Sequence, residues 1–429
     1  MSRPNILILN AHDLGRHLGC YGWQSVPSES IDSLAADGVQ FDNSFCTAPQ
    51  CSPSRAALHT GRHAHSVGVL GLAHHPFNWR LDPPQRHFAH RARDLGYTTA
   101  LIGMQHVTTN EDVPSLGFDH YSGVEPAADI AQKARAYLQS VDTEKPFYLE
   151  VGFEEPHRPY DFGGATPYDA EGVNLPAYIP DAPPAVADFA ALQGAIRAMD
   201  RAVGAVLEQL SDSGLAENTL VIFTTDHGLA MPRAKCTLYD PGIETALIMR
   251  WPAAGVHGGT RLEPLISHVD IVPTLLEALE QPVPADLHGR SFWPLLRGGD
   301  YEPRRYIFAE KTYHTSYEPQ RAVRSAGHKL IVNFETGSRY DVADDIRLSP
   351  TYPLVLHEVT GERQALELYD LSRDPNERHN LAGDPDYAEI EKTLRRRLWQ
   401  WMEDTGDPLR RGPVRSPFYE NSRNLLSAA

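Results

Sequence analysis

The chain has 429 residues, of which 41% are hydrophobic and 22% charged, the composition of an ordinary globular protein with a large buried core. Its net charge of −17 argues against a nucleic-acid backbone as the main partner, because acidic surfaces repel phosphates. Its four cysteines are too few for a disulfide scaffold, and their spacing matches no zinc site.

A short apolar run, residues 5–10, follows Met1-Ser2-Arg3-Pro4 at the N-terminus. The run is too short for a signal-peptide core or a membrane span, and no small-residue cleavage site follows it. We therefore expect a cytoplasmic protein with neither a membrane nor a nucleic acid as partner.

Short apolar segments alternate with helical patterns over the first part of the chain. This order predicts an α/β fold in which helices cover both faces of a mostly parallel sheet. The expected strands are 5–10, 98–102, 147–152, 220–225 and 245–250. The expected helices are 30–37, 52–60, 127–140, 185–213 and 269–279. Apolar residues recur at helical spacing in the longest of these helices, which indicates core packing rather than a cofactor site.

The character of the sequence changes around residues 295–305, where Gly, Pro and Arg are frequent. Strand-like runs are then expected at 306–310, 322–332 and 366–371, and a helix at 387–403. We expect three parts: a large α/β domain over 1–300, a smaller α+β subdomain over 301–410, and an extended tail over 411–429.

Two apolar strands each end in a pair of side chains that can bind a metal. His12 and Asp13 follow the first strand, and Asp226 and His227 follow the strand at 220–225. In open α/β sheets ligands bind beyond the carboxyl ends of strands, and carboxylates with imidazoles suit a divalent cation. Each pair alone could be an ordinary turn, but together they predict a metal site at one edge of the sheet.

The segment from Cys51 to Arg62 reads Cys-Ser-Pro-Ser-Arg-Ala-Ala-Leu-His-Thr-Gly-Arg. A cysteine there is ordinarily a small buried hydrophobe. Ser52 and Pro53 suit the first turn of a helix, so Cys51 projects from a helix N-terminus, where an anion is favoured. The Cys-x-Pro-Ser-Arg pattern, with Ala-Ala-Leu and Thr-Gly-Arg after it, resembles the signature of the sulfatase family.

The resemblance covers nearly the whole chain, with matched segments at 18–22, 96–106, 156–159, 226–228, 235–242 and 368–381. It implies an alkaline-phosphatase-like fold and the hydrolysis of sulfate esters or sulfamates, those of sugars included. It also implies that a formylglycine-generating enzyme oxidises Cys51 to formylglycine, whose hydrate is the nucleophile. Within the family, the chain most resembles the sulfamidases, which hydrolyse N-sulfoglucosamine.

The resemblance implies a role for each matched residue. The residues implied in catalysis are Cys51, Arg55, His106, His157 and Lys235. Those implied in metal binding are His12, Asp13, the modified residue 51, Asp226 and His227. Arg55 would steady the anionic hydrate, His106 would take a proton from it, and His157 with Lys235 would bind the sulfate and assist the leaving group. By contrast, His63, His65, His74 and His314 are expected to be structural histidines.

Two positions depart from the family pattern. His12 stands where the family usually has a second aspartate, and Met104 stands where it usually has a lysine. The single divalent ion is expected to be calcium or manganese, with zinc and iron as alternatives. Imidazole is a softer ligand than carboxylate, so His12 and His227 shift the expectation from calcium towards manganese, iron or zinc, unless His12 has left the ligand shell. The thioether of Met104 cannot replace an ammonium charge.

These departures leave other functions open. Phosphodiesterases and phosphonate monoester hydrolases of the same superfamily are the alternative enzymes, and a non-catalytic binding protein is a further one. If the chain is an enzyme of either class, its expected partner is a small anionic ester substrate, either a sulfated compound or a phosphodiester. The natural substrate and the oligomeric state, a homo-oligomer included, stay open.

Overall fold

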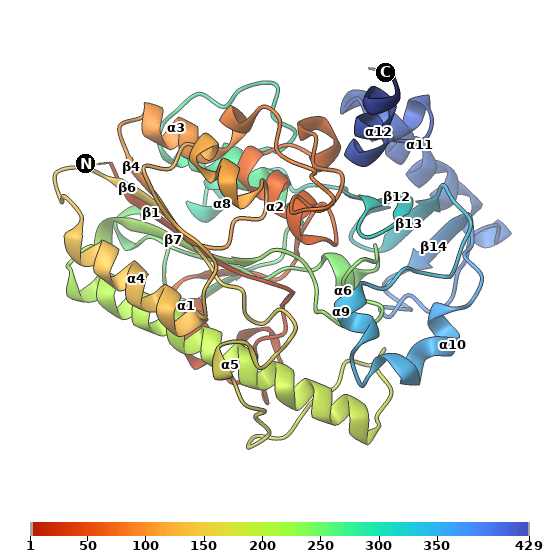
Figure 1. Ribbon diagram of the computed structural model, residues 1–429, viewed down its shortest axis with the longest axis horizontal. Coiled ribbons are helices and arrows are strands. Elements are labelled where there is room, and N and C mark those ends of the chain that lie inside the picture. The colour runs from red at the N-terminus through yellow and green to blue at the C-terminus, as the bar shows by residue number, and fades with distance from the viewer. Residues whose placement is uncertain (1–2, 428–429) are drawn as a thin grey trace.

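An eight-stranded sheet organises the first part of the chain in this computed structural model, which describes residues 3–427 (Figure 1). In spatial order its strands are β5 (His120–Ser122), β4 (Thr98–Gly103), β6 (Phe147–Gly152), β1 (Asn5–Ala11), β7 (Thr219–Thr225), β8 (Leu247–Arg250), β2 (Val39–Phe41) and β9 (Thr260–Leu262). The strands from β5 to β7 run parallel, whereas β8 is antiparallel to both its neighbours. The prediction of a mostly parallel sheet is confirmed. A separate parallel pair consists of β3 (Ser44–Phe45) and β10 (Ile266–Ser267).

The central strands are apolar because both of their faces are covered. In β1, Ile6 and Ile8 point into one core, while Leu7 and Leu9 point into the other, as the alternation of a strand requires. All four side chains are buried. Near-continuous apolar strands of this kind are typical of parallel sheets between two helical layers.

Two layers of helices sandwich this sheet (Figure 1). On one face lie α1 (Glu29–Asp37), α4 (Ala127–Ser140) and α5 (Pro183–Asp212). On the other lie α2 (Cys51–Thr60), α3 (Phe88–Asp94), α7 (Ile271–Ala278) and α8 (Trp293–Leu296). The apolar stripe of α5 is buried in the core of its face, which confirms the interpretation as core packing.

Short 3-10 helices connect these elements. They are η1 (Gly19–Tyr21), η2 (Ala64–Val67), η3 (Pro84–Arg86), η4 (Asn110–Leu116), η5 (Phe162–Gly164), η6 (Ala216–Asn218), η7 (Pro252–Ala254), η8 (His268–Asp270), η9 (Tyr352–Val355), η10 (Pro385–Tyr387) and η11 (Pro408–Arg411).

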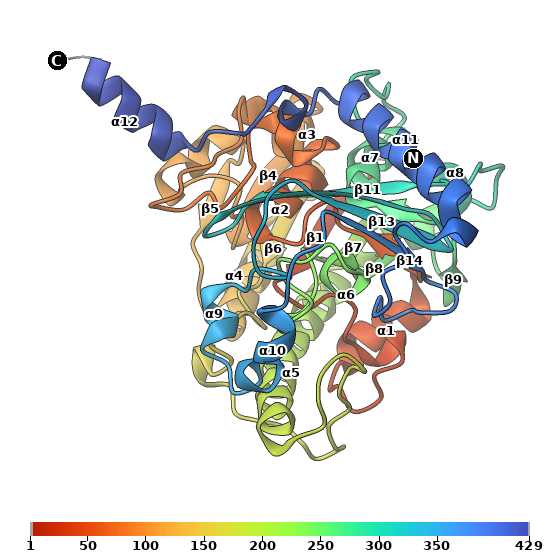
Figure 2. The same ribbon diagram turned by 90° about the vertical axis from the view of Figure 1, so that its right-hand side faces the viewer.

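A four-stranded antiparallel sheet forms the C-terminal part, in the order β11 (Ile307–Tyr313), β12 (Tyr317–Arg324), β13 (His328–Asn333) and β14 (Leu366–Asp370). The helix α11 (Ala388–Asp404) packs on one face of this sheet, as Figure 2 shows. Two short helices, α9 (Asp344–Arg347) and α10 (Leu356–Val359), lie in the long connection between β13 and β14. This connection reaches the large sheet, as the site below shows.

Buried ion pairs join the two sheets. Asp240 begins α6 (Asp240–Ile243), and its carboxylate bonds to Arg324 Nη2 at 2.8 Å and to Lys329 Nζ at 2.6 Å. Lys329 also bonds to Glu377 at 2.8 Å. Burial alone would raise the pKa of Asp240, but the two cations hold it below its usual value. The C-terminal sheet is therefore locked onto a loop of the large one.

Two expectations are wrong in detail. Residues 322–332, expected to form one strand, belong to two strands, β12 and β13. The chain turns between these strands, where the Ser325 N–H donates a hydrogen bond to the His328 carbonyl at 2.8 Å. The tail expected to be extended over 411–429 contains a helix, α12 (Pro417–Ser427), which has an amphipathic sequence and leaves the body of the molecule (Figure 2). Residues 428–429 lie outside the described part.

No helix within residues 3–427 combines the length and the apolar character needed to cross a bilayer.

Candidate active site

The ends of β1 and β7 meet at one edge of the large sheet. Their register pairs Ala11 with Thr225, so the next two residues of each strand enter the same space. The carboxylate of Asp226 ties the two loops together, because its Oδ1 accepts hydrogen bonds from the N–H groups of Asp13 and His227, each at 2.9 Å. Asp13 itself has a positive φ of 55°, a conformation that is uncommon outside glycine and recurs at functional sites.

Cys51 enters this space from α2, which it begins. Its Sγ lies 3.0 Å from His12 Nε2 and 3.4 Å from His227 Nε2. Pro53 in the first turn and Gly61, with a φ of 67°, at the end delimit the helix, and every residue of it is buried. Cys51 is thus held rigidly against the metal-competent side chains.

The five side chains predicted to bind a metal form one cluster. One ligand atom from each of His12, Asp13, Cys51, Asp226 and His227 lies within 4.8 Å of all the others, and all five residues are buried. His227 Nδ1 donates a hydrogen bond to the Gly228 carbonyl at 3.0 Å, which leaves the lone pair on Nε2. That lone pair faces Asp13 Oδ1 at 3.1 Å, so the two atoms need a cation or a proton between them.

The electrostatics of the cluster also call for a cation. Burial lowers the pKa of His227, yet Asp226 and Asp13 together raise it to about 10. Burial likewise opposes charge on His12, and the same anions with Cys51 still raise its pKa well above the usual value. A divalent ion would supply the positive charge that these protons otherwise provide, so the residues present fit the metal that was predicted.

Arg55 lies one turn along α2 from Cys51, fully buried. Its Nε donates to Asp226 Oδ2 at 3.1 Å, so the guanidinium orients a metal-competent carboxylate. Burial raises the pKa of the Cys51 thiol, but His12, Lys235 and His227 together lower it to about 7. Residue 51 therefore lies where negative charge is stabilised.

Lys235 and His157 form the next part of the site. Lys235 Nζ lies 2.6 Å from Asp13 Oδ2, 3.1 Å from His157 Nε2 and 3.0 Å from Asp345 Oδ2. His157 Nδ1 donates to the Arg158 carbonyl, so its Nε2 accepts from the lysine. Burial first, and then Lys235, lower the pKa of His157 to about 4, so the proton of this pair resides on the lysine.

His106 approaches the cluster from the segment after β4. Its Nε2 lies 2.8 Å from His74 Nδ1, the two rings stack, and its ring centroid is 6.0 Å from that of His12. Burial is the main cause that lowers the pKa of His106, which keeps the ring neutral. His106 and Met104 both line a cavity of about 710 Å³, to which Met104 brings no charge.

The structure thus brings together all the residues predicted from the sequence, and adds three that sequence reasoning missed. Asp345 comes from α9, and His74, expected to be structural, contacts His106. Glu154 lies 3.9 Å from His12 Nδ1 and 3.8 Å from His157 Nδ1. Glu154 follows β6 as Asp13 follows β1, so the strand-end argument could have found it.

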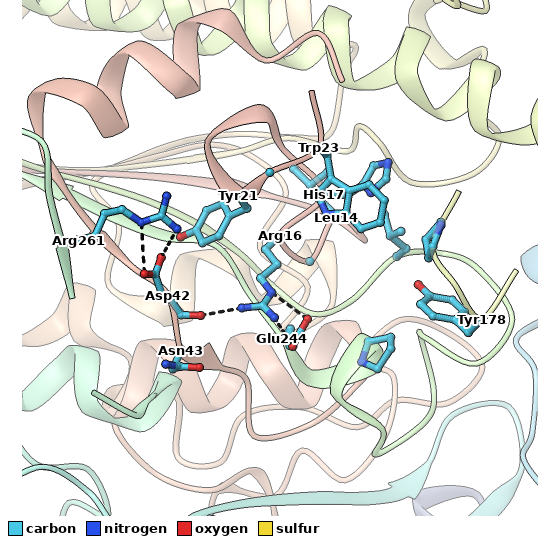
Figure 3. A pocket seen from close by; sticks show the side chains of 15 residues that line it. Leu14, Arg16, His17, Tyr21, Trp23, Asp42, Asn43, Tyr178, Glu244 and Arg261 are labelled. Carbon is cyan, nitrogen blue, oxygen red and sulfur yellow. Dashed lines mark hydrogen bonds and ion pairs between the residues drawn. The ribbon is translucent and has the colours of Figure 1, made fainter. Parts of the chain in front are cut away.

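A second cavity, of about 640 Å³, is lined by Leu14, Arg16 and His17 of the loop after β1 (Figure 3). It contains two arginines, but neither is free to bind an anion. Arg16 Nε bonds to Glu244 at 2.8 Å, and Arg261 Nη2 bonds to Asp42 at 2.7 Å, as the dashed lines of Figure 3 show. None of the site residues predicted from the sequence lines this cavity.

Two family models match the sequence. Residues 4–281 match the model described as Sulfatase, and residues 227–352 match the one described as N-sulphoglucosamine sulphohydrolase, C-terminal. The N-sulphoglucosamine sulphohydrolase of Homo sapiens is 32% identical, covering 95% of this chain and 91% of the relative. An ulvan-active sulfatase of Formosa agariphila is 30% identical, covering 97% of this chain and 83% of the relative.

Solved structures share the architecture. A 2-O GAG sulfatase superposes with a TM-score of 0.75 at 24% identity, covering 97% of this chain and 95% of its own. The phosphonate monoester hydrolase of Agrobacterium radiobacter superposes with a TM-score of 0.71 at 22% identity, covering 94% and 96%. At such identities the likeness establishes the alkaline-phosphatase-like fold and nothing finer.

Proposed function

This chain belongs to the sulfatase family, and from that premise we propose that it removes sulfate from sulfated sugars through a nucleophile made from Cys51. The observation that carries the proposal is the convergence of Cys51 with two carboxylates and two histidines at one buried point. The relatives named for N-sulphoglucosamine and ulvan support a sugar as the carrier of the sulfate.

Residue 51 would act as formylglycine. Oxidation of Cys51 by a formylglycine-generating enzyme converts the thiol into an aldehyde, whose hydrate offers one hydroxyl for attack and a second for release. In the structure Sγ therefore stands where these oxygens would lie, 3.0 Å from His12 Nε2. Arg55 supports this geometry indirectly, because it holds Asp226 in place.

The metal ligands would be His12, Asp13, Asp226 and His227, with residue 51 completing the shell. When bound, the ion would polarise the sulfate and lower the pKa of a hydroxyl at residue 51. Two carboxylates suit calcium or manganese, whereas two imidazoles also suit zinc or iron. We propose calcium or manganese first, because Asp13 and Asp226 supply the hard carboxylate oxygens that these ions prefer.

The remaining residues move protons and bind charge. Lys235, whose pKa is raised well above its usual value against the opposing effect of burial, is cationic in the resting site and attracts the negative charge of the sulfate. It also donates to His157 Nε2, so this pair can deliver a proton to the leaving atom. His106 is neutral, and its Nδ1 has no partner among residues 3–427. In the tautomer whose Nε2 donates to His74 Nδ1, this Nδ1 can accept the proton of the second hydroxyl.

We propose N-sulfated or O-sulfated sugars as the substrates, with measurable activity on phosphodiesters. A sulfate ester and a phosphodiester each carry one negative charge, so the cation missing at Met104 need not separate them. A phosphate monoester is nearly dianionic at neutral pH and should suffer most from that loss. The phosphodiesterase alternative is supported by Met104 and by the shared fold of the phosphonate monoester hydrolase.

The test compares kcat/KM for sulfate, sulfamate, phosphodiester and phosphomonoester versions of one leaving group. We expect the two sulfur substrates to lead and Cys51→Ala to abolish turnover, while mass spectrometry shows formylglycine at residue 51 in the active batch. A phosphodiester preference on the order of several hundredfold would transfer the protein to the alternative class. Full activity of Cys51→Ala would remove the proposed nucleophile. Met104→Lys should shift selectivity towards the more highly charged ester.

A further inference from the structure

Asp345 places a carboxylate inside a site that must bind an anion. Its Oδ2 lies 3.0 Å from Lys235 Nζ and 3.8 Å from His157 Nε2. Its side chain is 19% exposed, and its Oδ1 has no hydrogen-bond partner within the described part of the chain. Oδ2 of Asp345 is therefore paired with Lys235, while Oδ1 remains available to a bound molecule.

The position of Asp345 relative to His157 is fixed by other contacts. The next residue, Ile346, is buried in the core of the C-terminal part. Further along, the Thr351 hydroxyl donates to Asp188 Oδ2 at 2.6 Å, and Arg158, next to His157, bonds to both oxygens of Asp188 at 2.7 Å. This bridge ties the connection that carries Asp345 to the segment that carries His157.

The charge of Asp345 shows what it can recognise. A carboxylate repels a sulfate, so this one does not bind the sulfate oxygens. Asp13, His157 and Asp345 instead surround the ammonium of Lys235 at 2.6 to 3.1 Å, which also excludes a metal ion from the space that these three could otherwise share. The open Oδ1 is therefore left as an acceptor for N–H or O–H groups and as a partner for positive charge on a bound molecule.

We propose that Asp345 is a specificity-determining residue that selects a nitrogen leaving group, so that the enzyme favours N-sulfated over O-sulfated sugars. This inference rests on the proposed function and narrows its substrate class. An atom within hydrogen-bond reach of His157 Nε2 also lies near the Asp345 carboxylate, because the two are 3.8 Å apart. The leaving group that accepts a proton from the Lys235–His157 pair therefore also lies close to the Asp345 carboxylate.

The two leaving groups develop opposite charges: the nitrogen of a sulfamate becomes positive, and the oxygen of an ester becomes partly negative. When the S–N bond of a sulfamate breaks, its electron pair goes to nitrogen, the sulfuryl group goes to the oxygen at residue 51, and one proton arrives from the Lys235–His157 pair. Protonation makes this nitrogen positive before the bond breaks, and the free amine then takes a second proton from water. Asp345 stabilises that positive charge. In an ester the departing oxygen becomes partly negative, and the same carboxylate disfavours it.

The test uses two substrates that differ only in the atom joining sulfur to the ring: N-sulfoglucosamine and glucose 2-sulfate. Asp345→Asn keeps the shape of the side chain and removes its charge. Asp344→Asn is the matched control, because Asp344 lies on the same helix with its side chain 80% exposed. We expect wild type and Asp344→Asn to prefer the sulfamate. Asp345→Asn should lose at least about tenfold in kcat/KM on the sulfamate and less than about threefold on the ester.

Three other results would contradict either this inference or the proposed function. Equal losses on both substrates would show that Asp345 only positions Lys235, and would overturn the inference while leaving the sulfatase function intact. A wild-type enzyme that prefers glucose 2-sulfate would do the same. Inactivity of formylglycine-containing enzyme on every sulfated sugar would instead contradict the proposed function, and the inference with it. Product inhibition gives a second readout: Asp345→Asn should weaken inhibition by glucosamine but not by glucose, and equal weakening would again reduce Asp345 to a positioning role.

Discussion

At the scale of single residues, the site consists of buried charges that stabilise one another. Asp226 shows this most clearly, because its two oxygens receive the N–H groups of Asp13 and His227 and the guanidinium of Arg55. Burial would raise the pKa of Asp226, but His227, His12 and Arg55 keep it below its usual value. The carboxylate is therefore ionised and available to a metal throughout the neutral pH range.

The role of Asp226 leads to a prediction on metal content. Asp226→Asn removes the charge but keeps the acceptor for the two backbone N–H groups, so the fold should persist. Elemental analysis is expected to find about one divalent ion per wild-type chain and a large loss in the variant, together with loss of turnover. Asp300→Asn, an exposed substitution, should retain the ion. Undiminished metal in a folded Asp226→Asn protein would contradict the assignment.

Glu150 provides a prediction on pH and stability. It is buried in β6, where Tyr148 donates a hydrogen bond to it, and burial is the largest cause that raises its pKa from 4.5 to about 8. A raised pKa means that the folded chain holds a proton that the unfolded chain releases. Stability from this group is therefore complete at acid pH and is lost as the pH rises towards 8.

Glu150→Gln carries no such titration and keeps the acceptor for Tyr148. Relative to wild type, its free energy of unfolding should rise by about 1.4 kcal/mol per pH unit between pH 5 and pH 7, measured by urea denaturation. The exposed Glu144→Gln serves as the control and should show a constant difference from wild type. A flat difference for Glu150→Gln as well would mean that Glu150 ionises freely in the folded protein.

At the scale of elements, strand ends and helix starts position the chemistry. β1, β6 and β7 deliver His12 with Asp13, Glu154, and Asp226 with His227 to one edge, and α2 presents Cys51 at its first turn. The connection that carries α9 is irregular, yet it supplies Asp345 because Thr351 and Asp188 pin it. By contrast, α12 has no buried residue and leaves apolar side chains such as Phe418 and Leu425 exposed.

This difference predicts that α12 is dispensable for the fold. A chain ending at Ser416 keeps the hydrogen bonds of Val414 with Tyr313 and Tyr317. Its Tm should stay within about 2 °C of wild type, since the removed residues bury nothing in the body of the molecule. Its kcat/KM should be unchanged. A clear fall in Tm, or a smaller assembly by light scattering, would show instead that α12 packs against another copy of the chain.

At the scale of the whole molecule, two sheets share one set of buried contacts. We propose the division into a catalytic part over 1–300 and a smaller part over 301–410, since separate sheets occupy the two ranges. The two parts do not act independently, because Asp345 from the second reaches Lys235 in the first. The ion pairs of Asp240 with Arg324 and Lys329 lock them together.

We therefore expect one cooperative unfolding transition, sensitive to this lock. Asp240→Asn leaves Arg324 without its counter-charge and Lys329 with Glu377 alone, and should cost about 3–5 kcal/mol of stability at neutral pH. The pKa of Asp240 is held low, so its contribution is present above the ordinary pKa of a carboxyl and is lost as the pH falls below it. Calorimetry measures the loss of unfolding free energy in Asp240→Asn, with the exposed substitution Asp300→Asn as the control. Two separate transitions in wild type would contradict the shared core.

The sequence by itself determined the sheet type, the strands that end at the site, and the metal-competent pairs. These follow from local pattern: apolar runs predict buried strands, and polar pairs at the ends of parallel strands meet at one edge. The Cys-x-Pro-Ser-Arg signature pointed to Cys51 as the proposed nucleophile through its resemblance to the sulfatase family. The strand expected at 322–332 and the tail expected to be extended were wrong because a serine turn and a short amphipathic helix give weak local signals.

Only the tertiary structure decided which distant residues complete the site. Asp345 lies more than a hundred residues beyond Lys235, in a connection without strand or long helix, and no local pattern marks it as a neighbour of His157. His74 reads as an ordinary loop histidine until its ring stacks on His106. Contacts of this kind join segments that lie far apart in the sequence, and the periodicity of a single element carries no information about them.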